Sequence, residues 1–245
     1  MKRFLTLILI VNCFIMFGQS DLQKDVFHTS QGELEIYFVG HGTLMFNFDG
    51  KIIHIDPTMR EYDYSKMPPA DLILITHHHG DHLDATALRH IRKNDTRIVL
   101  TETCLETLKD AGDFTVMKNG DKMRVSGIEI EALPAYNIVH KRANGEPYHP
   151  KGVGNAYLVE LGGKKILIGG DTENIPELKV LKGVNIAFLP MNIPYTMTPE
   201  MAADLARAIQ PEILYPYHFG NTDTNELVDL LKDQKHIDVR IRDLQ

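Results

Sequence analysis

The segment Leu72–Asp84, which reads LILITHHHGDHLD, constrains the fold more than any other part of this sequence. It continues an apolar run, 70–76, that is typical of a buried strand. Four of the chain's 12 histidines follow within six positions, and from Asp84 the apolar spacing becomes helical, with Asp84 placed to cap a helix. The histidines are therefore expected on a loop between a strand and a helix. We call residues 76–84 the histidine loop.

Short β-rich segments dominate the first half of the chain, and strand-then-helix units dominate the second. Strands are expected at 33–39, 44–48, 51–55, 70–76, 97–100, 114–117, 122–125, 128–133, 155–161, 165–168, 184–189, 212–215 and 239–241. Helices are expected from 84 onward and at 103–111, 199–209 and 225–231. This order fits two mixed β-sheets whose outer faces are covered by helices, so the predicted class is α/β (α+β).

Residues 1–20 have the pattern of a signal peptide. Lys2 and Arg3 give a charged start, the apolar run 5–17 is short for a bilayer span, and small residues near position 20 offer a cleavage site. We predict export to the periplasm or the outside of the cell without a stable membrane anchor; a helix packed on the domain is the alternative. Residues 21–245 contain no linker or repeat and are predicted to form a single domain.

The composition indicates which kinds of molecule the protein can bind. The chain has 33 acidic and 26 basic residues and a formal net charge of −7, which argues against a dedicated nucleic-acid surface. Cys13 lies in the predicted signal peptide, so Cys104 alone remains and disulfides play no part. We expect a small-molecule substrate, while the sequence does not indicate an oligomeric state.

The histidine loop has the spacing of a metal site. Side chains at i and i+2 of an extended segment point the same way, so His77 and His79 can bind one ion. Asp81 and His82, on the following turn, can face a second ion, whereas His78 points away. A solvated histidine-rich loop would not require this four-ligand spacing.

Two distant residues follow apolar strands in a similar way. Asp171 ends the run KILIGGD, and His218 ends EILYPYH. A carboxylate at Asp171 could bridge two ions about 3.5–4 Å apart, and His218 could complete the second site. Taken alone, Asp171 could cap a helix and His218 could be a hydrogen-bonded core histidine.

With Asp56 in HIDP, the histidine loop, Asp171 in GGDT and His218, the chain resembles the metallo-β-lactamase-fold hydrolase superfamily over residues 33–242. The resemblance implies a four-layer αββα sandwich with two mixed sheets flanked by helices. It implies two metal ions, Zn²⁺ by preference, although the ligand types also suit Mn, Fe or Ni. It also implies that Asp56 steadies the histidine loop; a strand-end Asp before Pro57 is the structural alternative.

The family pattern expects one more histidine between the histidine loop and Asp171, and the chain has none at the strand end where it is expected. The strand-end position holds Asn137, and His140 and His149 lie farther along the loop 135–152. We predict His149 as the ligand because it lies shortly before the hairpin that leads to Asp171.

The resemblance also indicates a branch and a reaction. A true β-lactamase carries Cys at the bridging position, and a flavodiiron site would have Glu in place of His79. The chain looks most like the branch of ascorbate-phosphate lactonases and phospholipase D-like phosphodiesterases. We therefore expect a dinuclear hydrolase in which a water or hydroxide between the ions, oriented by the catalytic Asp81, cleaves an ester, lactone or phosphodiester. A catalytically silent metal-binding or scaffold protein of the same fold is the alternative.

Three further residues are expected near the substrate. His41 in GHGT, Lys151 and Tyr195 are predicted at the rim, where they could contact a leaving group or an anionic substituent. An ordinary turn or surface role is the alternative for each.

Overall fold

Two seven-stranded β-sheets pack against each other in the computed structural model, which describes residues 22–108 and 112–245. From edge to edge, the first sheet consists of β1 (Lys24–Thr29), β2 (Gly32–Gly40), β3 (Thr43–Phe48), β4 (Lys51–Ile55), β5 (Leu72–Leu74), β6 (Arg97–Leu100) and β7 (Phe114–Val116). The second consists of β14 (Asp238–Val239), β13 (Ile213–Tyr217), β12 (Ile186–Pro190), β11 (Lys164–Ile168), β10 (Gly154–Leu161), β9 (Ile128–Ala135) and β8 (Lys122–Val125).

Both sheets are mixed, and they are built alike. In the first sheet β1 to β4 pair antiparallel and β4 to β7 pair parallel. In the second sheet β8 to β11 pair antiparallel and β11 to β14 pair parallel. Because the strands of each sheet are contiguous in the sequence, the chain passes from one sheet to the other once, between β7 and β8.

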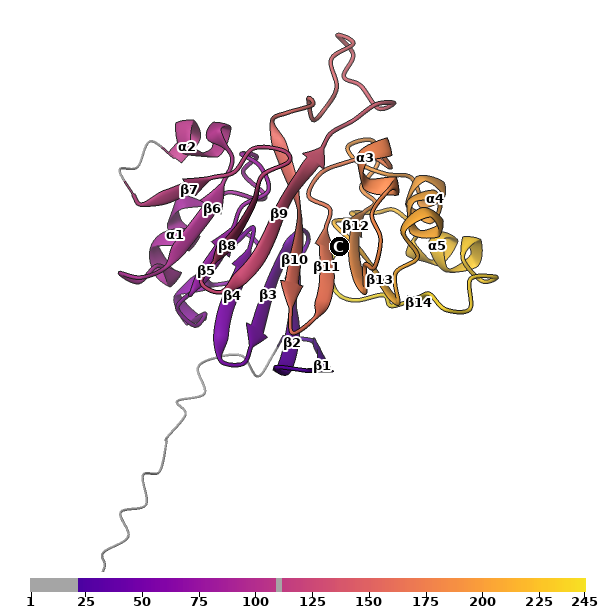
Figure 1. Ribbon diagram of the computed structural model, residues 1–245. Coiled ribbons are helices and arrows are strands. Elements are labelled where there is room, and N and C mark those ends of the chain that lie inside the picture. Colours follow the sequence, from indigo (N-terminus) through magenta and orange to yellow (C-terminus); the bar gives the residue numbers. More distant parts are fainter. Residues whose placement is uncertain (1–21, 109–111) are drawn as a thin grey trace, which may run out of the picture.

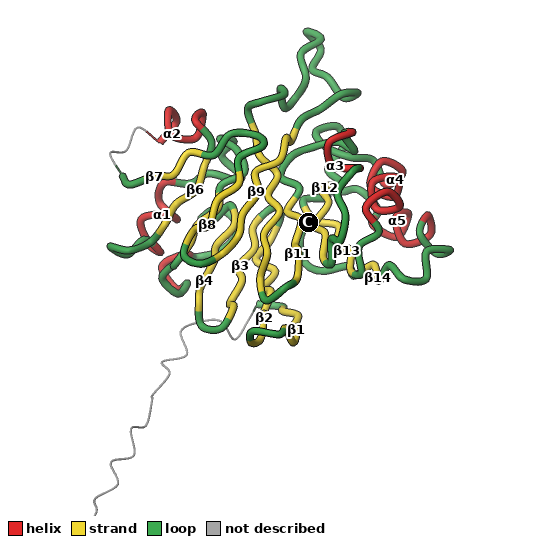
Figure 2. Tube along the Cα trace, in the orientation of Figure 1, coloured by secondary structure: helices red, strands yellow, loops and turns green. Residues whose placement is uncertain are grey.

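The helices lie outside the two sheets, which gives four layers (Figures 1 and 2). The first sheet is covered by α1 (Ala85–Ile91), α2 (Glu102–Leu108) and the 3₁₀ helix η2 (Tyr64–Lys66), and the second by α3 (Pro176–Lys179), α4 (Pro199–Ile209) and α5 (Thr224–Leu230). The predicted αββα sandwich with two mixed sheets is confirmed.

The largest apolar cluster lies between the sheets. Phe188 of β12 stacks on Tyr215 of β13 with ring centroids 4.9 Å apart, and Phe46 of β3 in the other sheet approaches Phe188 at 6.3 Å. Burying each large apolar side chain contributes on the order of 1.5–3 kcal/mol. This core fixes the two sheets against each other and thereby fixes the residues at their ends.

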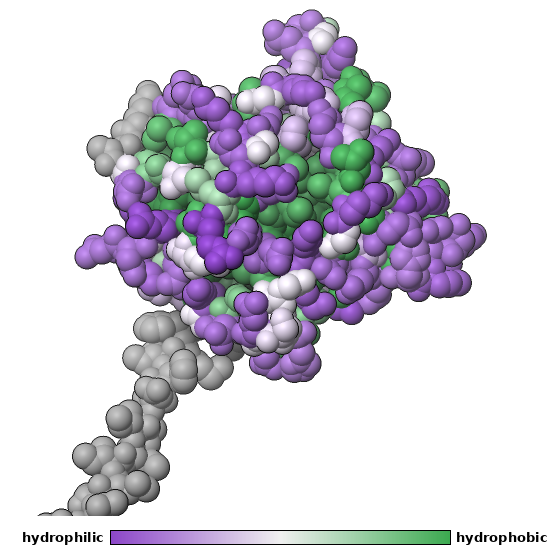
Figure 3. Space-filling model, viewed as in Figure 1, coloured by the Kyte–Doolittle hydropathy of each residue, from purple (hydrophilic) through white to green (hydrophobic). Residues whose placement is uncertain are grey.

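Helix α4 shows how the outer layers are read from the sequence. Thr198 accepts a hydrogen bond from the backbone N–H of Met201 as the N-cap, and Pro199 begins the helix. Its apolar side chains pack on the second sheet while Asp204 and Arg207 are exposed. In Figure 3 hydrophilic side chains accordingly cover the flank over α4 and α5.

Most predicted elements are present. The strands at 51–55, 97–100 and 122–125 and the helix at 199–209 have the predicted bounds, and Asp84 caps α1. The strand β1 and the helices η2 and α3 were not predicted, and β5 is shorter than the predicted 70–76.

Two predictions reach beyond the described residues. The signal peptide at 1–20 and the end of the helix predicted at 103–111 lie outside them, and export stays a prediction that N-terminal sequencing of the mature protein would test. Within residues 22–108 and 112–245, no helix has the length and apolar character needed to cross a bilayer.

Candidate metal centre

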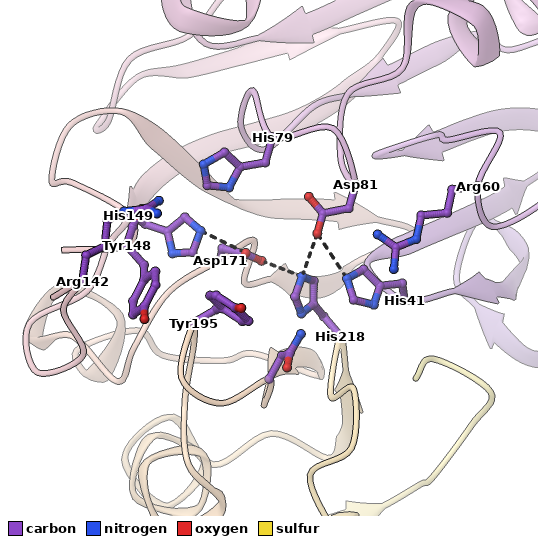
Figure 4. Close-up of a pocket in the computed structure, with 11 residues that line it drawn as sticks. His41, Arg60, His79, Asp81, Arg142, Tyr148, His149, Asp171, Tyr195 and His218 are labelled. Atoms are coloured by element: carbon purple, nitrogen blue, oxygen red, sulfur yellow. Dashed lines mark hydrogen bonds and ion pairs between the residues drawn. The ribbon is translucent and has the colours of Figure 1, made fainter. Parts of the chain in front are cut away.

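Strand ends from both sheets meet at one edge of the sandwich. The first sheet contributes the turn between β2 and β3, with His41, and the histidine loop after β5. The second sheet contributes Asp171 after β11, His218 after β13 and the long loop between β9 and β10, with His149. Figure 4 shows these side chains facing one another around a pocket.

The first cluster consists of His77, His79, His149 and Asp171, whose ligand atoms all lie within 4.8 Å of one another. His77 Nε2 is 3.1 Å from His79 Nδ1, and His149 Nε2 is 3.1 Å from Asp171 Oδ2. His77 Nε2 is 3.8 Å from the same carboxylate oxygen. Three imidazole nitrogens and one carboxylate oxygen thus converge on one point.

The second cluster consists of His41, Asp81, His82 and His218, and its ligand atoms also lie within 4.8 Å of one another. Asp81 Oδ2 is 3.4 Å from His41 Nε2 and 3.8 Å from His218 Nε2. His41 was predicted as a rim residue, but its ring lies inside this cluster, where its centroid is 3.7 Å from that of His218.

Asp171 joins the two clusters. Its Oδ1 lies 3.3 Å from His82 Nε2 and 3.4 Å from His218 Nε2, while its Oδ2 faces the first cluster. One carboxylate therefore presents one oxygen to each cluster, which is the arrangement of a bridging ligand.

Asp56 orients two histidines of the clusters, His82 directly and His77 through Thr76. Its carboxylate accepts hydrogen bonds from the backbone N–H and the hydroxyl of Thr76, at 2.7 and 2.6 Å, and lies 2.8 Å from His82 Nδ1. Thr76 Oγ1 in turn lies 3.0 Å from His77 Nδ1. With both Nδ1 atoms as donors, His82 and His77 present Nε2 to the clusters, as partners of metal-binding histidines commonly arrange.

Asn137 plays the same part for His149. Its Oδ1 accepts hydrogen bonds from the backbone N–H and from Nδ1 of His149, each at 2.8 Å. His140 lies elsewhere, with Nδ1 2.8 Å from Glu173 Oε1. Of the three residues considered for the missing histidine, only His149 therefore faces Asp171.

The backbone at three site residues is strained. His41, Asp56 and His218 have φ values of 49°, 46° and 47°, in the left-handed region that costs non-glycine residues on the order of 1–3 kcal/mol. Next to His41, a Cβ on Gly42 would lie 2.6 Å from His82 Cε1. The left-handed backbone at His41 and His218 and the absence of a side chain at Gly42 accompany the close packing of imidazoles in the second cluster.

The histidines and carboxylates of the clusters shift one another's pKa. Burial alone would lower the pKa of His82, but the carboxylates of Asp171, Asp56 and Asp81 outweigh it and raise that pKa to about 9. Burial would raise the pKa of Asp171, but His218, His82 and His77 hold it well below its ordinary value.

The histidine loop contains a contrasting group. Burial, and after it the neighbouring His149, lowers the pKa of His79 to about 4, so this imidazole is neutral near pH 7. It is therefore available as a ligand without losing a proton.

The residues present fit a pair of metal ions. Among the buried atoms of the described residues that make no hydrogen bond, four lie at the centre of the site: His41 Nε2, His82 Nε2, His218 Nε2 and Asp171 Oδ1. Leaving such atoms unpaired is costly, and imidazole with carboxylate is a donor set that suits Zn²⁺ and related divalent ions.

A pocket of about 370 Å³ opens beside the clusters. Besides cluster residues, it is lined by Arg60, Arg142, Tyr148, Asn192 and Tyr195. Tyr195 lines this pocket, and its contact with a substrate stays a prediction. Lys151 is not among the lining residues, and its Nζ lies 2.6 Å from Glu177 Oε1.

Sequence reasoning missed the two arginines. The length and polarity of the loop 135–152 marked it as a functional excursion, which was the available signal for Arg142. No sequence pattern distinguished Arg60 from other surface arginines.

Comparisons with known proteins agree with this geometry. Residues 35–218 match the family described as the beta-lactamase superfamily domain. A protein of Thermus thermophilus named UPF0173 metal-dependent hydrolase is 30% identical over 195 residues, which cover 76% of this chain and 84% of that protein.

Two solved structures are also similar. One from Parabacteroides distasonis, named a metal-dependent hydrolase, is 48% identical with a TM-score of 0.86, covering 91% of this chain and 100% of that chain. A metallo hydrolase of Ignicoccus hospitalis shares the fold, at 21% identity and a TM-score of 0.69, covering 86% of this chain and 95% of that chain.

Proposed function

Since the chain belongs to the β-lactamase superfamily and, within it, to the UPF0173 metal-dependent hydrolases, we propose that it is a dinuclear hydrolase of ester, lactone or phosphodiester bonds. One ion, Zn²⁺ by preference, would be held by His77, His79 and His149. The other would be held by the second cluster: His41, Asp81, His82 and His218. The position of Asp171, with one oxygen toward each cluster, is the observation that carries this proposal.

The side chains of the protein then have distinct tasks. When bound, two such ions supply Lewis-acid polarisation of the substrate and a water of lowered pKa. Asp171 sets the spacing of the two clusters. Asp81, whose side chain is 30% exposed, borders the pocket and can accept a hydrogen bond from a water there.

The protonation of Asp81 suits this orienting role. Burial would raise its pKa, but the nearby imidazoles of His218 and His41 and the charge of His82 hold that pKa far below the ordinary value. The carboxylate therefore stays ionised across the physiological range, as an acceptor that positions the attacking water must.

Metal content and turnover test the proposal together. The purified protein, loaded with Zn²⁺, is expected to contain about two ions per chain by elemental analysis, and to hydrolyse at least one member of a panel of aryl esters, lactones and phosphodiesters. Chelation should abolish that turnover and re-addition of Zn²⁺ should restore it.

A pair of matched variants sharpens this test. Asp171→Asn should lose at least one ion and reduce turnover about 100-fold or more. His78→Gln, in the same loop but in neither cluster, should retain both ions. Two tightly bound ions with no chelator-sensitive turnover on any substrate class would instead support the silent scaffold.

A further inference from the structure

Two arginines line the pocket beside the clusters, although the whole chain is acidic. The whole chain has a formal charge of −7, yet two guanidinium groups, Arg60 and Arg142, line the pocket. The two lining carboxylates, Asp81 and Asp171, each face histidines of the clusters. The carboxylates of the pocket therefore pair with histidines and leave the two guanidinium groups without a carboxylate partner among the lining residues.

The two arginines differ in whether a carboxylate lies within ion-pair distance of the guanidinium group. Arg60 Nε lies 3.4 Å from Glu61 Oε1. Arg142 has no carboxylate within ion-pair distance among the described residues; its guanidinium donates to the carbonyl oxygen of Tyr148 at 3.4 Å and lies 5.0 Å from the centre of that tyrosine ring. Arg142 is thus the cation with bonding capacity left for a ligand.

The segment that carries Arg142 is built to hold it over the pocket. Arg142 N–H donates to Glu146 O at 2.7 Å, and Gly145 N–H donates to Arg142 O at 2.9 Å, which closes a tight turn. Tyr148, under the guanidinium, packs edge-on against Tyr195 at 5.0 Å between ring centroids. In Figure 4, Arg142 and Tyr148 lie on the side of His149, and Arg60 lies on the side of Asp81 and His41.

Building on the proposed function, we infer that the substrate is a small anion whose phosphate or carboxylate group is bound by Arg142, beside the aromatic wall of Tyr148 and Tyr195. A volume of about 370 Å³ falls within the range of small-molecule pockets, about 300–1,000 Å³. A guanidinium matches the geometry of either oxyanion with paired N–H donors. The ester or lactone to be cleaved would then be presented to the clusters with its charged end toward the loop.

Binding of anions to the zinc-loaded protein tests this inference without turnover. Phenylphosphonate and phenylacetate are titrated calorimetrically into wild type, Arg142→Gln and Lys141→Gln, in a low-salt buffer free of phosphate. Lys141→Gln is the matched control. It removes the same charge at the adjacent position, and Lys141 does not line the pocket.

The expected pattern is specific. At least one anion should bind the wild type, Arg142→Gln should weaken that binding about 10- to 100-fold, and Lys141→Gln should change it less than about 2-fold. The ligand that loses more affinity in Arg142→Gln identifies phosphate or carboxylate as the group that Arg142 binds. Equal affinities for Arg142→Gln and Lys141→Gln, or no binding of either anion to the wild type, would overturn the inference.

Turnover separates this inference from the proposed function. Arg142→Gln should raise KM for 4-nitrophenyl succinate, an anionic ester, about 10-fold or more while leaving 4-nitrophenyl acetate, its neutral counterpart, within about 2-fold. Hydrolysis of both esters with no difference between variants refutes the role of Arg142 alone. Binding that depends on Arg142, without hydrolysis of any ester, lactone or phosphodiester, refutes the hydrolase and leaves the role of Arg142 standing.

Discussion

Asn137 shows how a single residue that zinc rarely selects can still shape a metal site. Its Oδ1 fixes both the backbone and the ring of His149, and its Nδ2 donates to the carbonyl oxygen of Tyr195 at 2.9 Å. The side chain thereby connects a candidate ligand to the wall of the pocket. We propose His149 as the ligand that the family pattern expects at the strand end, and Asn137 supplies the acceptor that orients its ring.

Replacing this amide should loosen the first cluster. In Asn137→Ala, His149 loses the acceptor for Nδ1, so affinity for one ion should fall about 10- to 100-fold in competition with a chromogenic chelator. Asn144→Ala serves as the control, because Asn144 lies at the exposed turn of the same loop and its side chain bonds to Glu146. Unchanged affinity in a folded Asn137→Ala protein would show that His149 needs no such support.

The sequence predicted these residues unevenly, for physical reasons. The spacing of His77 and His79 in extended backbone determines where their side chains point, so their convergence could be expected. The direction of His41 depends on a left-handed φ of 49° in a turn, which no alternation pattern reveals. Arg142 lies on a loop whose base bonds to a carboxylate distant in the sequence, and no local pattern reveals such a contact.

That carboxylate, Glu173, organises a whole element. It is 1% exposed and accepts hydrogen bonds from the consecutive backbone N–H groups of Ile138, Val139 and His140, at 2.6, 2.7 and 2.7 Å. The Asn137 amide adds a fourth at 3.2 Å. The base of the loop between β9 and β10 is therefore fixed by one buried charge, while Ile138 and Val139 expose their side chains.

Removing the charge should release the loop without unfolding the sheets. Glu173→Gln replaces charge-assisted hydrogen bonds by weaker ones, so the local stability of residues 138–149 should fall by about 2 kcal/mol. Faster amide hydrogen exchange confined to that segment is the expected readout. Glu177→Gln, which removes an acidic group on α3 that bonds to Lys151, should leave exchange there near the wild-type rate.

Element prediction succeeded where local signals coincide. In α4 a Thr cap, a Pro at the first turn and a one-sided apolar pattern all agree. The strand β1 reads KDVFHT and is half exposed, and α3 has four residues, too few to show helical periodicity. Such elements form because the neighbouring strand or loop already exists.

At the scale of the molecule, Asp25 of β1 ties the two sheets together. Its carboxylate accepts from Arg240 Nη1 at 3.0 Å, from Arg242 Nη2 at 2.8 Å and from the hydroxyl of Tyr215. Burial would raise the pKa of Asp25, but these three partners outweigh it and lower the pKa. An edge strand of the first sheet is thus bonded to β13 and the segment after β14.

This linkage has a defined pH dependence. Because the folded pKa is lowered, the stabilisation is complete above the unfolded pKa of about 3.9 and is lost as the pH falls through the folded value. Asp25→Asn should lower the free energy of unfolding by about 1–3 kcal/mol at pH 7, with a smaller deficit near pH 3. Urea titrations with chelator present measure both.

An exposed ion pair provides the comparison. Asp113 pairs with Arg97, and the Asp113 side chain is 81% exposed. Asp113→Asn should therefore change the free energy of unfolding by less than about 1 kcal/mol at either pH. A deficit for Asp25→Asn that is no larger than this, or that grows toward low pH, would contradict the linkage.

The single passage of the chain between the sheets has a consequence for the order of events during synthesis. Each cluster draws its members from both sheets: His149, Asp171 and His218 come from the second, and the other histidines and Asp81 come from the first. A nascent chain that has completed only β1 to β7 can offer no complete ligand set. Binding of a metal ion by a complete cluster therefore requires that the two halves of the chain have docked.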